Sequence, residues 1–136
     1  MRLALAPASE PSSYLAFDFG ARRVGVASGN TLTRTATPLT TVAAVGEARF
    51  EAIGRLIRDW RPAALVVGVP FHPDGAEHVN TARARRFGRQ LAARFDLPVH
   101  EVDERWSTTA AGAGGATDLD AAAAAVILGQ FLESAP

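Results

Sequence analysis

An unbroken apolar run at residues 63–67 constrains the fold of this chain more than any other feature. A run of this kind, followed by the turn signal Gly68-Val69-Pro70, is typical of a strand that is buried on both faces of a sheet. It is far shorter than the roughly eighteen consecutive apolar residues that a membrane helix needs, and no other run approaches that length. We therefore expect a buried sheet and no membrane-spanning segment.

The N-terminal part of the chain is typical of three antiparallel strands. Residues 14–19 alternate between two faces, and a second extended run at 24–27 follows after Gly20 and two arginines, which predicts a hairpin. A third extended segment at 33–37 is rich in β-branched threonine and is stopped by Pro38. Together these segments predict a three-stranded meander.

Helical spacing begins after this meander. Apolar side chains recur every three or four residues in 47–60 and again in 77–95, and an alanine-rich helix is expected at 119–133. A further strand is expected at 98–103. The order is thus three strands followed by alternating helices and strands, which predicts an α/β fold with a mixed sheet of about five strands flanked by helices.

Length and composition fit one domain. The chain has 136 residues, of which 48% are apolar and 21% are charged, and this composition is globular rather than disordered. We expect a loose N-terminal tail at 1–13, where proline and serine are frequent, and a single domain at 14–136. Cysteine is absent, which excludes disulfides, thiolate metal sites and cysteine nucleophiles, and we expect a cytoplasmic location.

The net charge does not indicate a polyanionic partner, because fourteen basic residues balance fourteen acidic ones. A nucleic-acid partner would need a local patch instead. All the basic residues are arginines, which can hold phosphate through two parallel hydrogen bonds. On the second predicted helix, Arg83, Arg85, Arg86 and Arg89 form either a solvated face or such a patch.

Asp18 lies inside an otherwise apolar predicted strand, where an unpaired carboxylate is costly to bury. Three interpretations are open. The carboxylate forms an ion pair with Arg22 or Arg23, or it caps the turn beside Gly20, or it takes part in catalysis.

Asp103 and Glu104 end the last predicted strand, at the edge of the sheet where sites in such folds usually lie. Because adjacent strand residues point to opposite faces, only one of these two acids can share a face with Asp18. An exposed acidic strand end that pairs with Arg105 is the structural alternative.

Asp120 opens the last predicted helix. At about 100° per residue it falls on the same stripe as Ala123, Ile127 and Phe131, which predicts that it points towards the sheet. Asp118 faces away, and a role as a helix cap or dipole partner is sufficient to explain it. Three inward carboxylates would repel one another unless divalent cations neutralise them. Oxygen ligands favour Mg²⁺ or Mn²⁺, and two such ions can promote phosphodiester hydrolysis.

Several motifs occur together, in one order, along residues 15–134. They are Phe17-Asp18-Phe19-Gly20, Arg23-Val24-Gly25-Val26-Ala27, Val67-Gly68-Val69-Pro70, Asp74-Gly75, Asp103-Glu104-Arg105-Trp106-Ser107-Thr108, and Asp120-Ala121-Ala122-Ala123-Ala124 before Val126-Ile127-Leu128. In this combination the chain resembles the YqgF/RuvX family. Members of that family have a ribonuclease H-like fold and are described as Holliday junction resolvases and as nucleases that mature the ends of pre-16S ribosomal RNA.

The resemblance implies that Asp18, Glu104 and Asp120 are catalytic acids that bind Mg²⁺ or Mn²⁺, with Asp103 as the alternate for Glu104. Substrate contacts are expected from six arginines: Arg22, Arg23, Arg83, Arg86, Arg89 and Arg105. The family's connection between the last strand and the last helix is usually longer and contains basic residues. In this chain residues 109–119 contain none.

The expected function is metal-dependent phosphodiester hydrolysis of structured nucleic acid, as 5′-end maturation of pre-16S rRNA, as Holliday junction resolution, or as both. We expect a nucleic-acid partner, no membrane, and a monomer or homodimer. The alternative is a non-catalytic nucleic-acid or ribosome-assembly binding protein of the same fold, in which the acids serve structure. An actin-like ATPase is disfavoured because that architecture needs two such domains.

Overall fold

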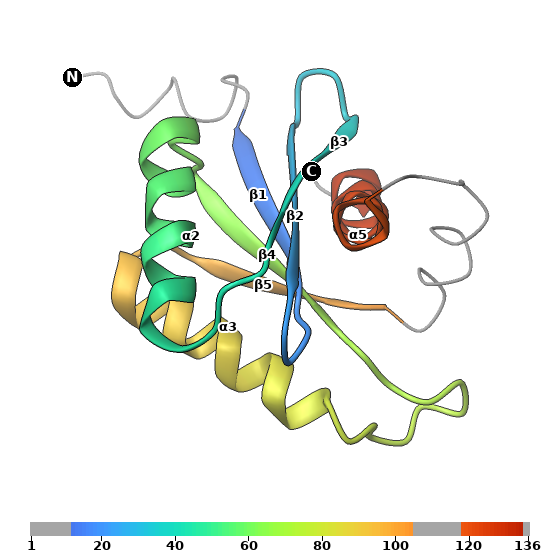
Figure 1. Cartoon of the computed structure of the whole chain (residues 1–136). Coiled ribbons are helices and arrows are strands. Elements are labelled where there is room, and N and C mark those ends of the chain that lie inside the picture. The colour runs from blue at the N-terminus through green and yellow to red at the C-terminus, as the bar shows by residue number, and fades with distance from the viewer. Residues whose placement is uncertain (1–11, 105–117, 135–136) are drawn as a thin grey trace.

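The computed structural model describes residues 12–104 and 118–134, which form one five-stranded sheet and three helices (Figure 1). The sheet has the order β3-β2-β1-β4-β5, in which β1–β2 and β2–β3 are antiparallel and β1–β4 and β4–β5 are parallel. This arrangement confirms the predicted α/β class and the mixed sheet. The elements are β1 (Ser13–Asp18), β2 (Val24–Asn30), β3 (Ala36–Val42), α2 (Gly46–Trp60), β4 (Ala64–Val69), α3 (Thr81–Phe95), β5 (Val99–Asp103) and α5 (Leu119–Ser134).

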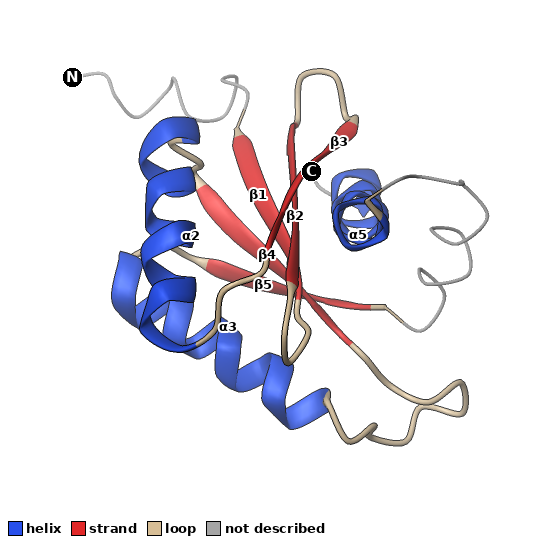
Figure 2. Cartoon of the chain, viewed as in Figure 1, coloured by secondary structure: helices blue, strands red, loops and turns tan. Residues whose placement is uncertain are grey.

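Helices cover both faces of the sheet (Figure 2). α2 and α3 lie on one face, and α5 lies on the other. In β1, Leu15 and Phe17 point into the core beneath α2 and α3, whereas Ala16 points into the core beneath α5. Asp18 continues this alternation and therefore points to the α5 face.

The core beneath α2 and α3 follows the predicted helical spacing. Ala84, Phe87 and Leu91 form the buried stripe of α3, and burial of a side chain such as Phe87 contributes about 1.5–3 kcal/mol. Both helices end at a residue with left-handed backbone, Arg61 after α2 and Asp96 after α3. In each case its N–H donates to a carbonyl of the last turn, and its left-handed backbone turns the chain out of the helix.

The predicted position of the third strand, 33–37, is wrong, because β3 runs over Ala36–Val42. Residues 31–33 form a turn in which the Asn30 side chain accepts two backbone hydrogen bonds. Pro38 does not end the strand, because β3 lies at the edge of the sheet, beside a shift in its register with β2. An edge strand tolerates the missing N–H of a proline.

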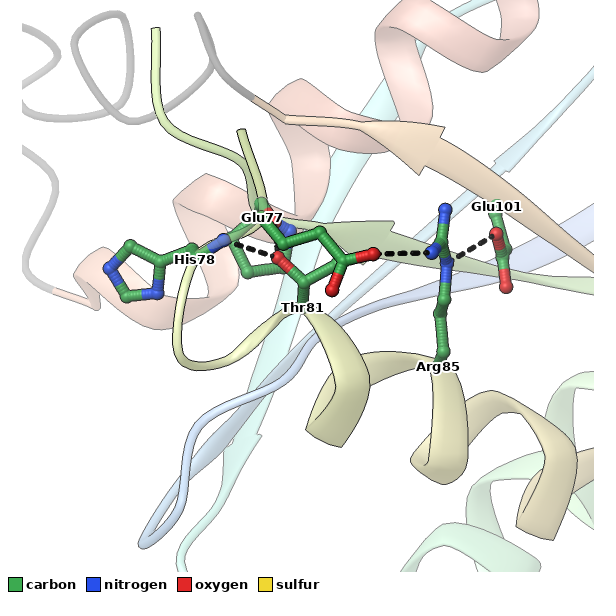
Figure 3. A network of polar contacts seen from close by, with 6 residues as sticks. Glu77, His78, Thr81, Arg85 and Glu101 are labelled. Carbon is green, nitrogen blue, oxygen red and sulfur yellow. Dashed lines mark hydrogen bonds and ion pairs between the residues drawn. The ribbon is translucent and has the colours of Figure 1, made fainter. Parts of the chain in front are cut away.

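α3 also begins later than the predicted range of 77–95, at Thr81. The Thr81 hydroxyl explains the difference, because it accepts a hydrogen bond from the His78 N–H over 2.8 Å (Figure 3). The same hydroxyl donates a hydrogen bond to the Pro70 carbonyl. These bonds hold the preceding residues in a loop that is tied to the end of β4.

The first described strand begins close to the predicted start of the domain at residue 14. β1 begins at Ser13, the last residue of the segment 1–13 that is expected as a tail, and residues 1–11 lie outside the described part. Within residues 12–104 and 118–134, no helix is long and apolar enough to cross a membrane.

Candidate active site

The candidate site is centred on Asp18, the last residue of the central strand. Asp18 pairs with Gly25 of β2 on one side and with Gly68 of β4 on the other. Neither neighbour has a side chain, so the sheet around the Asp18 carboxyl leaves room for other groups. A Cβ atom on Gly25 would lie only 1.8 Å from the backbone oxygen of Asp120, so this glycine lets the first turn of α5 pack directly on the sheet.

Glu104 follows β5 and lies on the same face of the sheet. In β5, His100 and Val102 contact α5, whereas Glu101 pairs with α3. The alternation continues to Glu104, whose backbone N–H still donates to β4 over 3.2 Å, and it places Asp103 on the opposite face. Of the two acids that the sequence leaves open, Glu104 is therefore the one that shares a face with Asp18.

Asp18 and Glu104 share a side-chain hydrogen bond. Burial raises the pKa of Glu104 to about 8, together with the charge and hydrogen bond of Asp18 and the charge of Asp103. Burial also raises the pKa of Asp18 to about 6, although the hydrogen bond to Glu104 opposes this rise and the charge of Asp120 adds to it. At neutral pH the two carboxyl groups therefore share one proton in the hydrogen bond between them.

Asp120 lies in the first turn of α5, and its charge is close enough to contribute to the raised pKa of Asp18. Its carboxylate nevertheless pairs with Arg23, with 2.9 Å between Asp120 Oδ2 and Arg23 Nε. The ion pair with Arg23 that the sequence leaves open for Asp18 is thus formed by Asp120 instead. Across the described residues, no group of three or more histidine or acidic side chains is placed to hold a metal ion. Of the three predicted ligands, Asp18 and Glu104 therefore lie together, whereas Asp120 is paired with Arg23.

Asp118 caps α5, in agreement with its interpretation from the sequence. Its Oδ1 accepts hydrogen bonds from the Thr41 hydroxyl and, over 3.1 Å, from the Ala121 N–H. These bonds, the one from Thr41 first, hold the pKa of Asp118 below its usual range. The cap satisfies a backbone N–H in the first turn of α5, the turn that carries Asp120.

The arginines expected to bind substrate lie in two places. Arg22 and Arg23 are exposed on the loop between β1 and β2. Arg83, Arg86 and Arg89 are exposed on α3, and none of them forms an ion pair with any residue that the structure describes. Both groups are accessible to a large ligand.

Arg85 differs from its neighbours on α3. It pairs with Glu77 at 3.8 Å and with Glu101 of β5 at 3.4 Å (Figure 3). Its guanidinium also lies over the Phe71 ring. These contacts give Arg85 a structural role in joining α3 to the sheet. Arg105, which is also expected to bind substrate, lies outside the described residues.

Sequence reasoning misses Arg49, which is only 7% exposed although it carries a charge. A signal for its burial is present in the sequence. Arg49 precedes Ile53 by one helical turn and therefore falls on the buried stripe of α2.

Known proteins that resemble the chain agree on its family. A family model described as RuvX: Holliday junction resolvase matches residues 12–134. A protein of Polaromonas sp. (strain JS666 / ATCC BAA-500) named "Putative pre-16S rRNA nuclease" is 66% identical over 124 residues, which cover 91% of this chain and 90% of that protein. A protein of the same name from Paraburkholderia phytofirmans is 54% identical over 134 residues, which cover 93% of this chain and 92% of that protein.

Solved structures agree on the fold. T. thermophilus RuvC in complex with a Holliday junction substrate superposes with a TM-score of 0.56 at 18% identity, covering 90% of this chain and 94% of that chain. Thermus thermophilus RuvC in a second structure gives a TM-score of 0.53 at 16% identity. At these identities the likeness concerns the fold, and it confirms the predicted ribonuclease H-like architecture. The descriptions of the family model and of the relatives are those of nucleases, which confirms the expected class of enzyme. The chain belongs to the RuvX family, whose model is described as Holliday junction resolvase.

Proposed function

We propose that this chain hydrolyses phosphodiester bonds in structured nucleic acid, with the 5′ end of pre-16S ribosomal RNA as its substrate. The observation that carries the proposal is the hydrogen-bonded pair of Asp18 and Glu104. The pair lies at the carboxyl end of the parallel strands, where sites in such sheets are built. The names of the relatives support the choice of RNA substrate.

Asp18, Glu104 and Asp120 would hold the divalent cation that the reaction requires, Mg²⁺ or Mn²⁺. The donor set fits such an ion, because all the side-chain ligands are carboxylates, and burial and neighbouring negative charge raise the pKa of two of them. On binding, the pair of Asp18 and Glu104 would give up its shared proton, and Asp120 would exchange the Arg23 guanidinium for the ion. The bound ion would supply activation of the attacking water and neutralisation of the charge that develops on the phosphate.

The other groups of the site would bind and position the substrate. Arg22 is exposed and forms no ion pair with a described residue. Its neighbour Arg23, once it is released by Asp120, would be free to contact a phosphate. Contacts of this kind fix the register of the strand without reading its sequence. The arginines proposed to contact substrate phosphates are Arg22, Arg23, Arg83, Arg86, Arg89 and Arg105.

Cleavage of a labelled RNA that carries the 5′ precursor extension of 16S rRNA tests the proposal, in Mg²⁺, in Mn²⁺ and in EDTA. We expect cleavage only with metal. Asp18→Asn should lower the rate at least about a hundredfold, since even groups that merely support metal ligands contribute up to about that factor. Circular dichroism and thermal melting of the variant check that its fold is retained.

Each other outcome has a defined meaning. Activity of Asp18→Asn within a few-fold of the intact chain would move the site elsewhere. Unfolding of the variant would favour a structural role for the acid pair. RNA binding without cleavage in any metal would favour the non-catalytic binding protein.

A four-way DNA junction is the second candidate substrate, because the description of the matching family favours it. Structured RNA and DNA are both recognised largely through backbone shape, so cleavage of the two substrates should be measured side by side.

Symmetric cleavage of a junction requires two copies of the chain. The solution mass in the same buffer, monomer or homodimer, therefore belongs to the same experiment. For either substrate we propose a cytoplasmic location.

A further inference from the structure

A groove of about 410 Å³ lies on the α2/α3 side of the sheet, opposite the face that carries the acid pair. Its walls come from α2, from α3 and from the loop that follows β1. Among the described residues that line it, three are arginines and none is acidic. The polar and loop residues that line it are Phe19, Ala21, Arg49, Arg83, Arg86 and Gln90.

Arg49 is the buried part of this groove. Its Nε donates to the Ala44 carbonyl and its Nη2 to the Ala21 carbonyl, each over 3.0 Å, and its guanidinium lies 5.7 Å from the centre of the Phe19 ring. All these partners are neutral, and no carboxylate of the described residues pairs with Arg49. Burial without a counter-ion is costly for a cation, and it also lowers the pKa of Arg49. An anion in the groove would offset that cost.

Arg83 and Arg86 extend this unmatched charge to the surface. Both are exposed, and neither forms an ion pair with a described residue. Arg85, between them on the same helix, is already paired with Glu77 and Glu101 (Figure 3). Of these three neighbouring arginines, Arg83 and Arg86 line the groove without an ion pair to a described residue, whereas Arg85 is paired towards the sheet.

We infer that this groove binds a backbone phosphate of the substrate strand, beyond the phosphate that is cleaved. Asp18 points to the α5 face, and Phe19, the next residue, points to α3, where its ring lies 5.2 Å from that of Phe87. The acid pair and the groove are therefore on two sides of one loop, residues 19–23. A strand held at Asp18 that crosses this loop passes the exposed Arg22 and reaches the groove.

The inference rests on the proposed function and deepens it. Phosphate contacts fix the position of a strand and carry no sequence information. The groove would therefore set the position of the strand that flanks the cleavage point, and the length that this strand needs. Each phosphate contact also releases counter-ions from the nucleic acid, which gives the groove a measurable salt signature.

The test is RNA binding by a variant that combines Arg83→Gln with Arg86→Gln. The matched control combines Arg55→Gln with Arg58→Gln, which removes the same charge from exposed positions of α2 that do not line this groove. Affinity for the labelled pre-16S RNA is measured in EDTA over a salt series, by fluorescence anisotropy. We expect the groove variant to bind about tenfold or more weakly near 0.1 M salt, with a salt slope smaller by roughly 1.5, and the control to bind like the intact chain.

The same proteins are then compared in cleavage with metal, where KM should rise in the groove variant more than kcat falls. If the groove variant binds and cleaves like the control while the intact chain is active, phosphate binding by the groove is overturned and the proposed function stands. If the intact chain binds the RNA more tightly than the groove variant but does not cleave it, the proposed function fails and phosphate binding by the groove is supported. If the intact chain does not bind the RNA, both fail.

Arg49 has a separate test because its variants can lose stability. Arg49→Lys keeps the buried charge and Arg49→Met removes it, while both lose carbonyl hydrogen bonds. Thermal melts identify the temperature at which both variants are folded. Binding there should be retained better by Arg49→Lys, and equal binding by the two would overturn the role of the buried charge.

Discussion

Glu104 Oε2 lies 2.7 Å from the position that a Cβ atom on Gly68 would occupy. Gly68 of β4 is the partner of Asp18 of β1. Because Gly68 has no side chain, the Glu104 carboxyl has room to lie beside Asp18. The same position lies 2.4 Å from Cδ1 of Ile127 in α5. A methyl group at Gly68 would therefore press on both the acid pair and the core beneath α5.

Gly68→Ala should lower the cleavage rate about ten- to a hundredfold, because it displaces the Glu104 carboxyl from Asp18. Its cost in the free energy of unfolding should be about 1–3 kcal/mol, since the neighbours are the ends of side chains that can move. Gly129→Ala is the matched control. It lies in α5 with nothing within 4 Å of the new methyl group, and it should leave cleavage unchanged and raise stability by about 0.5–1 kcal/mol. Full activity of Gly68→Ala would show that the position of Glu104 does not matter for cleavage.

Gly25→Ala should cost more stability than Gly68→Ala. The new methyl group would lie 1.8 Å from the backbone oxygen and 2.2 Å from the carbonyl carbon of Asp120, and backbone atoms cannot rotate away. The first turn of α5 must shift as a unit, so we expect a loss of about 3 kcal/mol or more, beyond the common range for added methyl groups. Urea unfolding of the two variants measures the difference. A smaller loss for Gly25→Ala would contradict the direct packing of α5 on β2.

The sequence places Asp18 and Asp120 on their elements, because Asp18 lies within an apolar strand and Asp120 directly precedes the apolar positions of the last helix. The periods themselves predict the order of strands and helices. Other parts of the site depend on contacts between distant segments. The choice between Asp103 and Glu104 needs the register of β5, which only the paired strands define. The pairing of Asp120 with Arg23 needs the path of α5 across β2. Periodicity within one segment contains neither relationship.

The shared proton predicts a pH dependence for the metal-free protein. Glu104 has a pKa of about 8 in the folded chain and its ordinary value, 4.5, in the unfolded chain. Between these values the folded state holds more protons than the unfolded state, so the free energy of unfolding should fall as the pH rises. Asp18, with a pKa of about 6, acts in the same direction over the lower part of this window.

Urea unfolding in EDTA between about pH 5 and pH 8 measures this effect, with Glu104→Gln as the comparison. The amide does not titrate, so the variant should show a flatter dependence, while every other titrating group outside the pair is common to both proteins. Equal slopes for the two proteins would contradict the shared proton.

Asp118 and Asp120, the two acids at the start of α5, should respond differently to substitution by alanine. Asp118→Ala removes the cap from Ala121 and the bond from Thr41, and it should cost about 0.5–2 kcal/mol. Asp120→Ala removes a partly exposed ion pair, which contributes at most about 1 kcal/mol, and also a negative charge that raises the pKa of Asp18. The metal-free stability of Asp120→Ala should therefore stay level or rise.

Added Mn²⁺ should reverse this order. An ion that binds only the folded chain stabilises it by mass action, so the rise in melting temperature reports the ligands that remain. Asp118→Ala should keep the full rise, because its carboxylate is committed to the cap. Asp120→Ala should lose most of it, because one of the three proposed ligands is gone. Thermal melts of both variants with and without Mn²⁺ measure the effect. An Asp120→Ala protein that is destabilised without metal and yet responds fully to Mn²⁺ would exclude Asp120 from the metal site.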